Sequence, residues 1–186
     1  MSKAGDMCSI CRPGSYTSKR LKVEEERIVQ LLESMQIPFI REHRISFCGA
    51  QQGNTTFALL DFLIEQLSRR IIVSVDERQH DSWSGYEISC ELARMADVCQ
   101  AIALEDNSRP LLWVRYNPNA YRVDGELCKT GRGDRQLALS ALLRDGTSTG
   151  IVYMYYDVDE SNQLIIAGKD GYDSVFHATY VTKVIT

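Results

Sequence analysis

Two acidic residues interrupt or directly follow strongly apolar stretches in the middle of this sequence. Asp61 lies inside the run 57–64, and Asp76 follows the run 71–75, with His80 a few residues later. An unpaired carboxylate costs several kcal/mol in an apolar interior, so an acid in such a place needs a partner or a function. Two carboxylates and a nearby imidazole match a site for a divalent metal ion and a proton carrier.

These apolar stretches predict two neighbouring strands joined by the short polar segment 66–70. Because side chains alternate along a strand, Ser74 and Asp76 share one face while Val75 points to the other. The spacing therefore places a hydroxyl beside a carboxylate, next to the strand that contains Asp61.

Hydrophobic spacing predicts alternating helices and strands along the rest of the chain. Helices are expected at 23–35, 86–104 and 134–143, and further strands at 39–47, 111–116, 150–158 and 163–168, with a last strand near the C-terminus. The predicted class is α/β or α+β, with a mixed central sheet flanked by helices and a C-terminal β-hairpin extension.

Length and composition indicate one domain. The chain has 186 residues, of which 44% are hydrophobic and 25% charged, which is enough for a hydrophobic core. Residues 1–19 are expected to be a flexible tail and residues 20–186 a single domain, with its core at 21–145 and C-terminal strands at 150–186. The chain shows neither the roughly 20 apolar residues that span a bilayer nor a signal peptide, so an intracellular protein, cytoplasmic or nuclear, is expected.

Charge and cysteine usage bear on the partners. The net charge of −4 argues against non-specific coating of nucleic acid, which Lys and Arg drive, but local basic clusters remain. The six cysteines are scattered, as is typical of reduced thiols. Cys8 and Cys11 would supply half of a tetrahedral zinc site, but a tail with incidental cysteines explains them as well.

The order of the motifs resembles a known nuclease superfamily. A helix with a glutamate is followed by a strand, by DFL at 61–63, VDERQH at 75–80, ELARM at 91–95 and VRYNP at 114–118. This order is similar to the PD-(D/E)XK superfamily, in the branch of the very-short-patch mismatch repair endonuclease and the EDxHD homing endonucleases. The resemblance covers about residues 21–143. Within this superfamily, the sequence especially resembles uncharacterised nuclease-like proteins of large DNA viruses and protists. It implies a restriction-endonuclease-like fold.

The resemblance also implies roles for the matching residues. Asp61 matches the metal-binding aspartate, and His80 matches the catalytic histidine of the mismatch-repair branch. Ser74 stands where Glu is common in the superfamily, and Asp76 stands where Lys is common. Mg²⁺ or Mn²⁺ is the implied cofactor, with Asp61, Asp76 and Ser74 as ligands. The helix-borne glutamate is assigned to Glu25, with Glu24 or Glu26 as alternatives, and Asp81 is a further candidate to orient His80. Arg94, Arg115 and Gln79 are candidates for substrate binding.

Structural roles for these residues stay open. In these structural roles, Asp61 would pair with Arg69 or Arg70, and Asp76 would cap the following turn. His80 would lie on the surface, and Glu25 would be one of the negative charges at the N-terminus of its helix. Arg94 or Arg115 would hold a buried acid in place.

Two functions follow from these alternatives. The first is a metal-dependent endonuclease that cleaves or nicks DNA at a site, mismatch or branch, with RNA left open as a substrate. The second is an inactive nuclease fold that serves as a nucleic-acid-binding or assembly module, which the departure at Ser74 and the acidic net charge would suit. The apolar and aromatic run 151–156 also raises a homodimer as an alternative.

Overall fold

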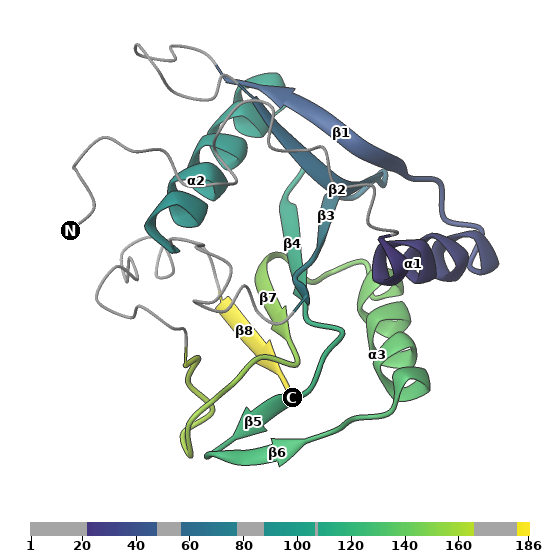
Figure 1. Cartoon of the computed structure of the whole chain (residues 1–186). Coiled ribbons are helices and arrows are strands. Elements are labelled where there is room, and N and C mark those ends of the chain that lie inside the picture. The colour runs from purple at the N-terminus through teal and green to yellow at the C-terminus, as the bar shows by residue number, and fades with distance from the viewer. Residues whose placement is uncertain (1–21, 48–56, 78–87, 107, 166–181) are drawn as a thin grey trace.

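The computed structural model describes residues 22–47, 57–77, 88–106, 108–165 and 182–186 (Figure 1). The predictions for the N-terminal tail, for Cys8 and Cys11, and for Gln79, His80 and Asp81 lie outside these residues.

The helices and strands follow the predicted order, apart from two short strands at 121–123 and 126–128 that were not predicted. The elements are α1 (Val23–Ser34), β1 (Ile40–Ser46), β2 (Phe57–Glu65), β3 (Arg70–Val75), α2 (Ile88–Glu105), β4 (Leu111–Tyr116), β5 (Tyr121–Val123), β6 (Glu126–Cys128), α3 (Arg132–Arg144), β7 (Gly150–Met154) and β8 (Thr182–Ile185).

One mixed sheet organises the fold. Its strand order is β1-β2-β3-β4-β7-β8, and β5 and β6 form a separate hairpin. The first three strands pair antiparallel, whereas β3, β4, β7 and β8 pair parallel. The predicted α/β class with a mixed sheet is therefore confirmed.

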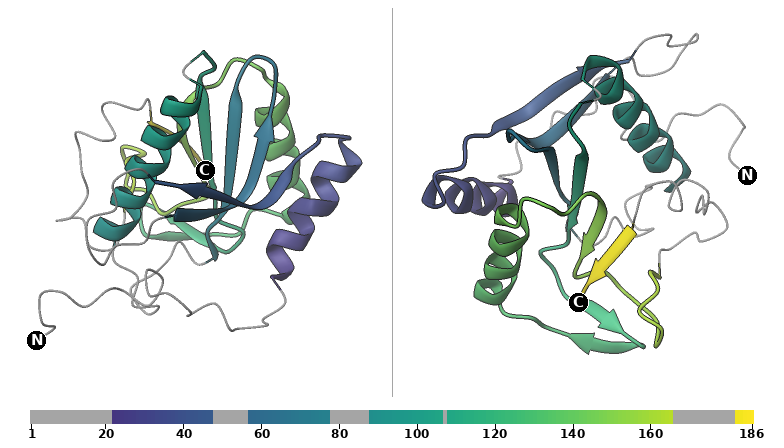
Figure 2. Two further views of the ribbon diagram at one scale, coloured as in Figure 1. Left: turned by 90° about the horizontal axis from the view of Figure 1, so that it is seen from above. Right: turned by 180° about the vertical axis from the view of Figure 1, so that it is seen from behind.

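Helices cover both faces of this sheet. Figure 2 shows α2 on one face and α1 and α3 on the other, and each face has its own hydrophobic core. Phe62 and Val73 contribute to the core on the α1 and α3 side, and Ile72 and Trp113 to the core on the α2 side. Strands β3 and β4 are buried on both faces, which explains why they appear in the sequence as continuous apolar runs.

The C-terminal part differs from the prediction. Strand β7 lies inside the sheet and pairs parallel with both β4 and β8, so it is no arm of a hairpin and no extension of the core. Among the described residues of the predicted strand at 163–168, Leu164 forms a single bridge with Val158. The apolar run 151–154 is buried on both faces, the pattern of an interior parallel strand.

Candidate functional site

The site is built where β2 and β3 separate. Their backbone pairing ends at Phe62 and Val73. Beyond this pair, the side chain of Asp61, and not its backbone, contacts β3. The backbone N–H of Val75 donates to Asp61 Oδ2 over 2.8 Å. Because strand N–H groups point along the plane of the sheet, the Asp61 carboxylate lies in that plane, between the two faces. The carboxyl ends of β3, β4 and β7 meet at this same edge.

Negative charge accumulates around Asp61. Burial, together with the charges of Glu25 and Asp76, raises the pKa of Asp61 to about 6, against the opposing effects of the Val75 hydrogen bond and the charge of Lys22. The largest cause of this shift is the loss of water around the carboxylate, which disfavours its ionised form. Perturbed acids of this kind are concentrated at functional sites.

On the α1 side, the acids are paired with cations near the surface. Glu25 is buried on α1, together with Ile28 and Leu32. Lys22 Nζ lies 2.9 Å from Glu25 and 3.0 Å from Glu42 of β1. Arg41 approaches Glu25 at 3.4 Å and Glu26 at 2.9 Å.

On the α2 side, the acids are paired with buried arginine. Asp76 accepts hydrogen bonds from Arg115 and from the Tyr156 hydroxyl. Arg115 also donates to Glu91 of α2 over 2.6 Å, and Arg94 binds both oxygens of Glu91 at 2.9 and 2.7 Å. Burial opposes ionisation of Glu91, but the charges of Arg94 and Arg115 lower its pKa to about 2.

The two arginines therefore hold acids in place. Arg115 is only 4% exposed and lies between two carboxylates, so in this arrangement it does not face a substrate. Arg94 is the structural partner of a buried acid, one of the alternatives that its sequence context left open.

Ser74 has a protein partner as well. Its hydroxyl accepts a hydrogen bond of 3.0 Å from the indole N–H of Trp113, and both side chains are buried on the α2 side. The two arginines considered as partners of Asp61 bind elsewhere. Arg69 donates to backbone carbonyls, and Arg70 pairs with Glu65 and Glu105.

The structure brings Glu25, Asp61 and Asp76 to one edge of the sheet, and it adds residues that sequence reasoning missed. Tyr156 carries no local signal in the sequence, since it reaches Asp76 across 80 positions, whereas Lys22 lies three residues before its partner Glu25. Glu91 was noted only as part of a motif, although its spacing of three residues from Arg94 on a helix is a recognisable pairing signal.

The acids at this edge are the candidate ligands for a divalent ion, and most of them already have protein partners. Within the described ranges, three His, Cys, Asp or Glu side chains do not converge into a cage for a metal ion. Mg²⁺ commonly takes one or two carboxylates and keeps its waters or adds substrate phosphate. Asp61 and Glu25 are the two carboxylates considered for such an ion. Glu25 is paired with Lys22 and Arg41, and Ser74 and the Asp76 oxygen bound by Arg115 also have protein partners.

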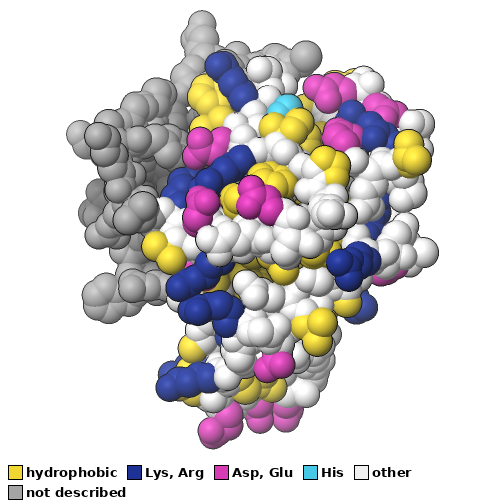
Figure 3. Space-filling model, turned by 90° about the vertical axis from the view of Figure 1, so that its right-hand side faces the viewer, with side chains coloured by type: hydrophobic (Ala, Val, Ile, Leu, Met, Phe, Trp, Pro, Cys, Tyr) yellow, Lys and Arg dark blue, Asp and Glu magenta, His cyan; other side chains and the backbone are white. Residues whose placement is uncertain are grey.

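The surface near α1 and α3 is of mixed charge. In Figure 3, Lys and Arg side chains alternate with Asp and Glu over this face, without a continuous basic patch. None of the helices in the described part of the chain combines the length and hydrophobicity needed to cross a membrane.

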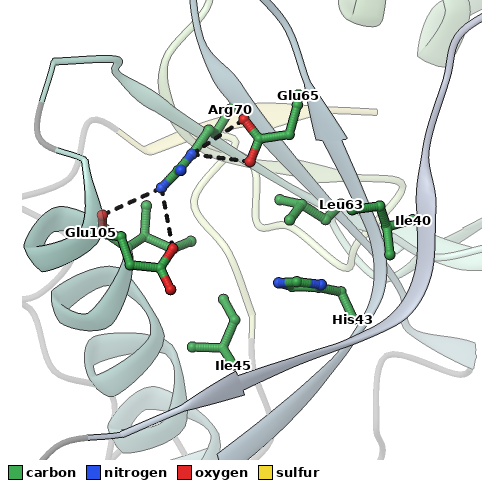
Figure 4. A pocket seen from close by; sticks show the side chains of 8 residues that line it. Ile40, His43, Ile45, Leu63, Glu65, Arg70 and Glu105 are labelled. Carbon is green, nitrogen blue, oxygen red and sulfur yellow. Dashed lines mark hydrogen bonds and ion pairs between the residues drawn. The ribbon is translucent and has the colours of Figure 1, made fainter.

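A separate hollow of about 160 Å³ lies at the opposite end of β3. Figure 4 shows the His43 imidazole pointing into it across from the ion pairs of Arg70 with Glu65 and Glu105. Its remaining walls are aliphatic, formed by Ile40, Ile45, Leu63 and Ile102.

Comparison of the sequence with protein-family models and with curated proteins gave no match.

Proposed function

We propose that this chain is a metal-dependent nuclease that hydrolyses phosphodiester bonds of DNA. The observation that supports this most is the Asp61 carboxylate, which lies in the opening between β2 and β3 with a pKa raised to about 6 by burial and by neighbouring acids. A cation at this position would relieve an arrangement that is otherwise unfavourable.

The order of the elements supports the same proposal. Helix α1 with Glu25 precedes β2 with Asp61, and Asp76 follows β3 before α2 and β4. This is the order that the resemblance to the PD-(D/E)XK nucleases implies. The edge formed by the carboxyl ends of parallel strands is also where open sheets commonly bind ligands.

The residues have distinct roles in the proposed reaction. Asp61 and Glu25 would hold Mg²⁺ or Mn²⁺, which supplies charge neutralisation at the scissile phosphate and a more acidic bound water. Asp76, fixed by Arg115 and Tyr156, keeps a negative charge beside Asp61 and so favours a bound cation. His80 is proposed to accept the proton of the attacking water, because an imidazole titrates near neutral pH.

The test is cleavage of supercoiled, mismatched and branched DNA with Mg²⁺ or Mn²⁺. We expect cleavage by the full chain, with loss of product in the presence of chelator and in Asp61→Asn. Asp124→Asn is the matched control, because it makes the same charge change at an exposed turn whose left-handed backbone Asn tolerates. Equal cleavage by wild type and Asp61→Asn would contradict the proposal.

A second function, an inactive nuclease fold that binds nucleic acid or assembles with a partner, is favoured by one observation. Arg115 and Tyr156 both donate to Asp76 Oδ2. This oxygen is therefore occupied by protein groups, which reduces the number of carboxylate oxygens that could bind a metal ion. DNA binding in a fluorescence anisotropy assay, without product on any of the three substrates, would support this alternative over the first.

A further inference from the structure

The paired ends of β1 and β2 form a two-stranded ribbon beside the proposed site. This ribbon consists of residues 43–46 and 57–60, which stay paired with each other beyond the last backbone pair of β2 with β3. One face of the ribbon lies against α2, where Ile45, Ala58 and Leu60 belong to the hydrophobic core. Figure 1 shows α2 beside this end of β1 and α1 beside its other end.

The second face of the ribbon carries a cation stacked on an aromatic ring. Side chains alternate along a strand, so Arg44, Phe57 and Leu59 share the face that points away from α2. The guanidinium carbon of Arg44 lies 4.1 Å from the centroid of the Phe57 ring, which is a cation–π contact. Phe57 and Leu59 belong to neither hydrophobic core of the described residues. Because Arg44 is exposed and Phe57 only half-buried, a ligand can reach this pair.

Arg44 differs in its partners from the other arginines around the site. Arg41, Arg94 and Arg115 each bind carboxylates. Arg44 forms no ion pair with an acid among the described residues, and its contact there is with the Phe57 ring. A guanidinium that lies over a ring keeps its second face and its N–H groups available. Proteins use planes of this kind to stack unpaired bases, and the same N–H groups to bind phosphate.

The position of this pair suits a nucleic acid strand that enters the site. Phe57 precedes Asp61 by four residues on β2, which is about 13 Å at about 3.3 Å per strand residue. This separation equals about four nucleotides at the spacing of about 3.4 Å in B-form DNA, and fewer in an extended strand. A base at Phe57 and a phosphate at Asp61 can therefore belong to one strand.

We propose that Arg44 and Phe57 form a stacking platform for an unpaired base of the DNA strand that is cleaved. The inference rests on the proposed function and assigns its substrate class, DNA with unpaired nucleotides next to the scissile phosphate. The base stacks on the platform, and the N–H groups of Arg44 bind a neighbouring phosphate. In a fully paired duplex the bases already stack on one another, so the platform adds affinity only for unpaired strands.

Fluorescence anisotropy of the full chain with a labelled thymidine oligonucleotide tests this inference. Chelator is present, so that no cleavage interferes, and the same oligonucleotide annealed to its adenosine complement serves as the duplex probe. Phe57→Leu keeps an apolar side chain but removes the ring, and we expect it to bind the single strand about tenfold more weakly than wild type. Arg44→Lys keeps the charge but removes the planar group, and we expect a loss of about fivefold.

The matched control is Arg144→Lys, which makes the same exchange at an exposed arginine in the last turn of α3, outside the ribbon. This variant should bind both probes like wild type. Binding of the duplex should be unchanged in all three variants, because the duplex offers no unpaired base. Thermal unfolding of each variant verifies that it is folded.

The outcomes separate the inference from the nuclease function. Single-strand affinity of Phe57→Leu or Arg44→Lys equal to that of wild type would overturn the inference, as would equal losses with the duplex or no single-strand binding by wild type. A loss confined to the single strand supports the inference even where no DNA is cleaved, and in that case only the hydrolytic function fails. If cleavage depends on Asp61 while both ribbon variants bind like wild type, the stacking platform alone fails.

Discussion

Replacement of Asp61 by asparagine is expected to stabilise the protein at neutral and alkaline pH. Most acid-to-amide substitutions at buried positions remove a favourable charge interaction. Asp61 is different, because its environment disfavours the ionised form. The asparagine side chain would keep the acceptor oxygen for the N–H of Val75 and would remove the charge that burial, Glu25 and Asp76 oppose.

The magnitude follows from the shift in the pKa of Asp61. The value rises from 3.8 to about 6, and each pKa unit corresponds to about 1.4 kcal/mol. The folded state binds the proton more tightly than the unfolded state, so stability falls as the pH rises from about 4 through 6, by about 3 kcal/mol in all. Above that range we expect Asp61→Asn to gain about 2–3 kcal/mol, or roughly 5–10 °C in melting temperature. At pH 4 the gain should vanish.

Urea unfolding of wild type and variant between pH 4 and 8 measures this effect. Asp76→Asn makes the same charge change at the neighbouring acid, but it deprives the buried Arg115 of a partner. It should therefore destabilise by about 3 kcal/mol. An Asp61→Asn variant that is less stable than wild type at pH 8, or equally stable at all pH values, would refute the proposed charge imbalance at the site.

Three further perturbations test the surrounding network. The pKa of Glu91 is about 2, below its usual 4.5. Ionised Glu91 therefore adds to the free energy of unfolding above pH 4.5, and this stabilisation is lost as the pH falls toward 2. Urea unfolding should show a loss of about 3 kcal/mol over this range that is absent in Glu91→Gln. Arg69→Met should destabilise by at least about 3 kcal/mol in the same assay, because the fully buried guanidinium binds carbonyls at the end of α3. Ser74→Ala should cost about 1 kcal/mol through the lost bond to Trp113, while the calorimetric affinity for Mn²⁺ stays unchanged; a large drop would restore Ser74 as a ligand.

The central strands were predictable from the sequence because burial on both faces leaves an unambiguous signal. Strand β4 has the bounds expected for it, and β2 and β3 flank the expected polar turn. The apolar spacing of residues 86–104 predicts Ala96 on the buried face of α2, but Ala96 is exposed and Val98 is buried. The C-terminal strands were misjudged because an apolar run indicates burial but not the strand with which it pairs.

The site was predictable only in part. Asp61 stood out because an acid inside an apolar run has to be explained, and the structure places it at the opening of the sheet. The partners of Asp76 were beyond local analysis. Arg115 lies 39 positions away and Tyr156 lies 80 positions away, and pairing of β3, β4 and β7 brings them together.

The acids at this edge of the sheet differ in how firmly they are neutralised. Asp76 and Glu91 share Arg115, whose side chain is only 4% exposed. If Arg115 moved away, these two buried carboxylates would lose a shared cation, which is energetically costly. Glu25 and Glu42, by contrast, share Lys22, whose side chain is 42% exposed and can exchange with solvent. The cation on the α1 side is therefore the more replaceable one, whereas the acids on the α2 side stay paired with Arg94 and Arg115.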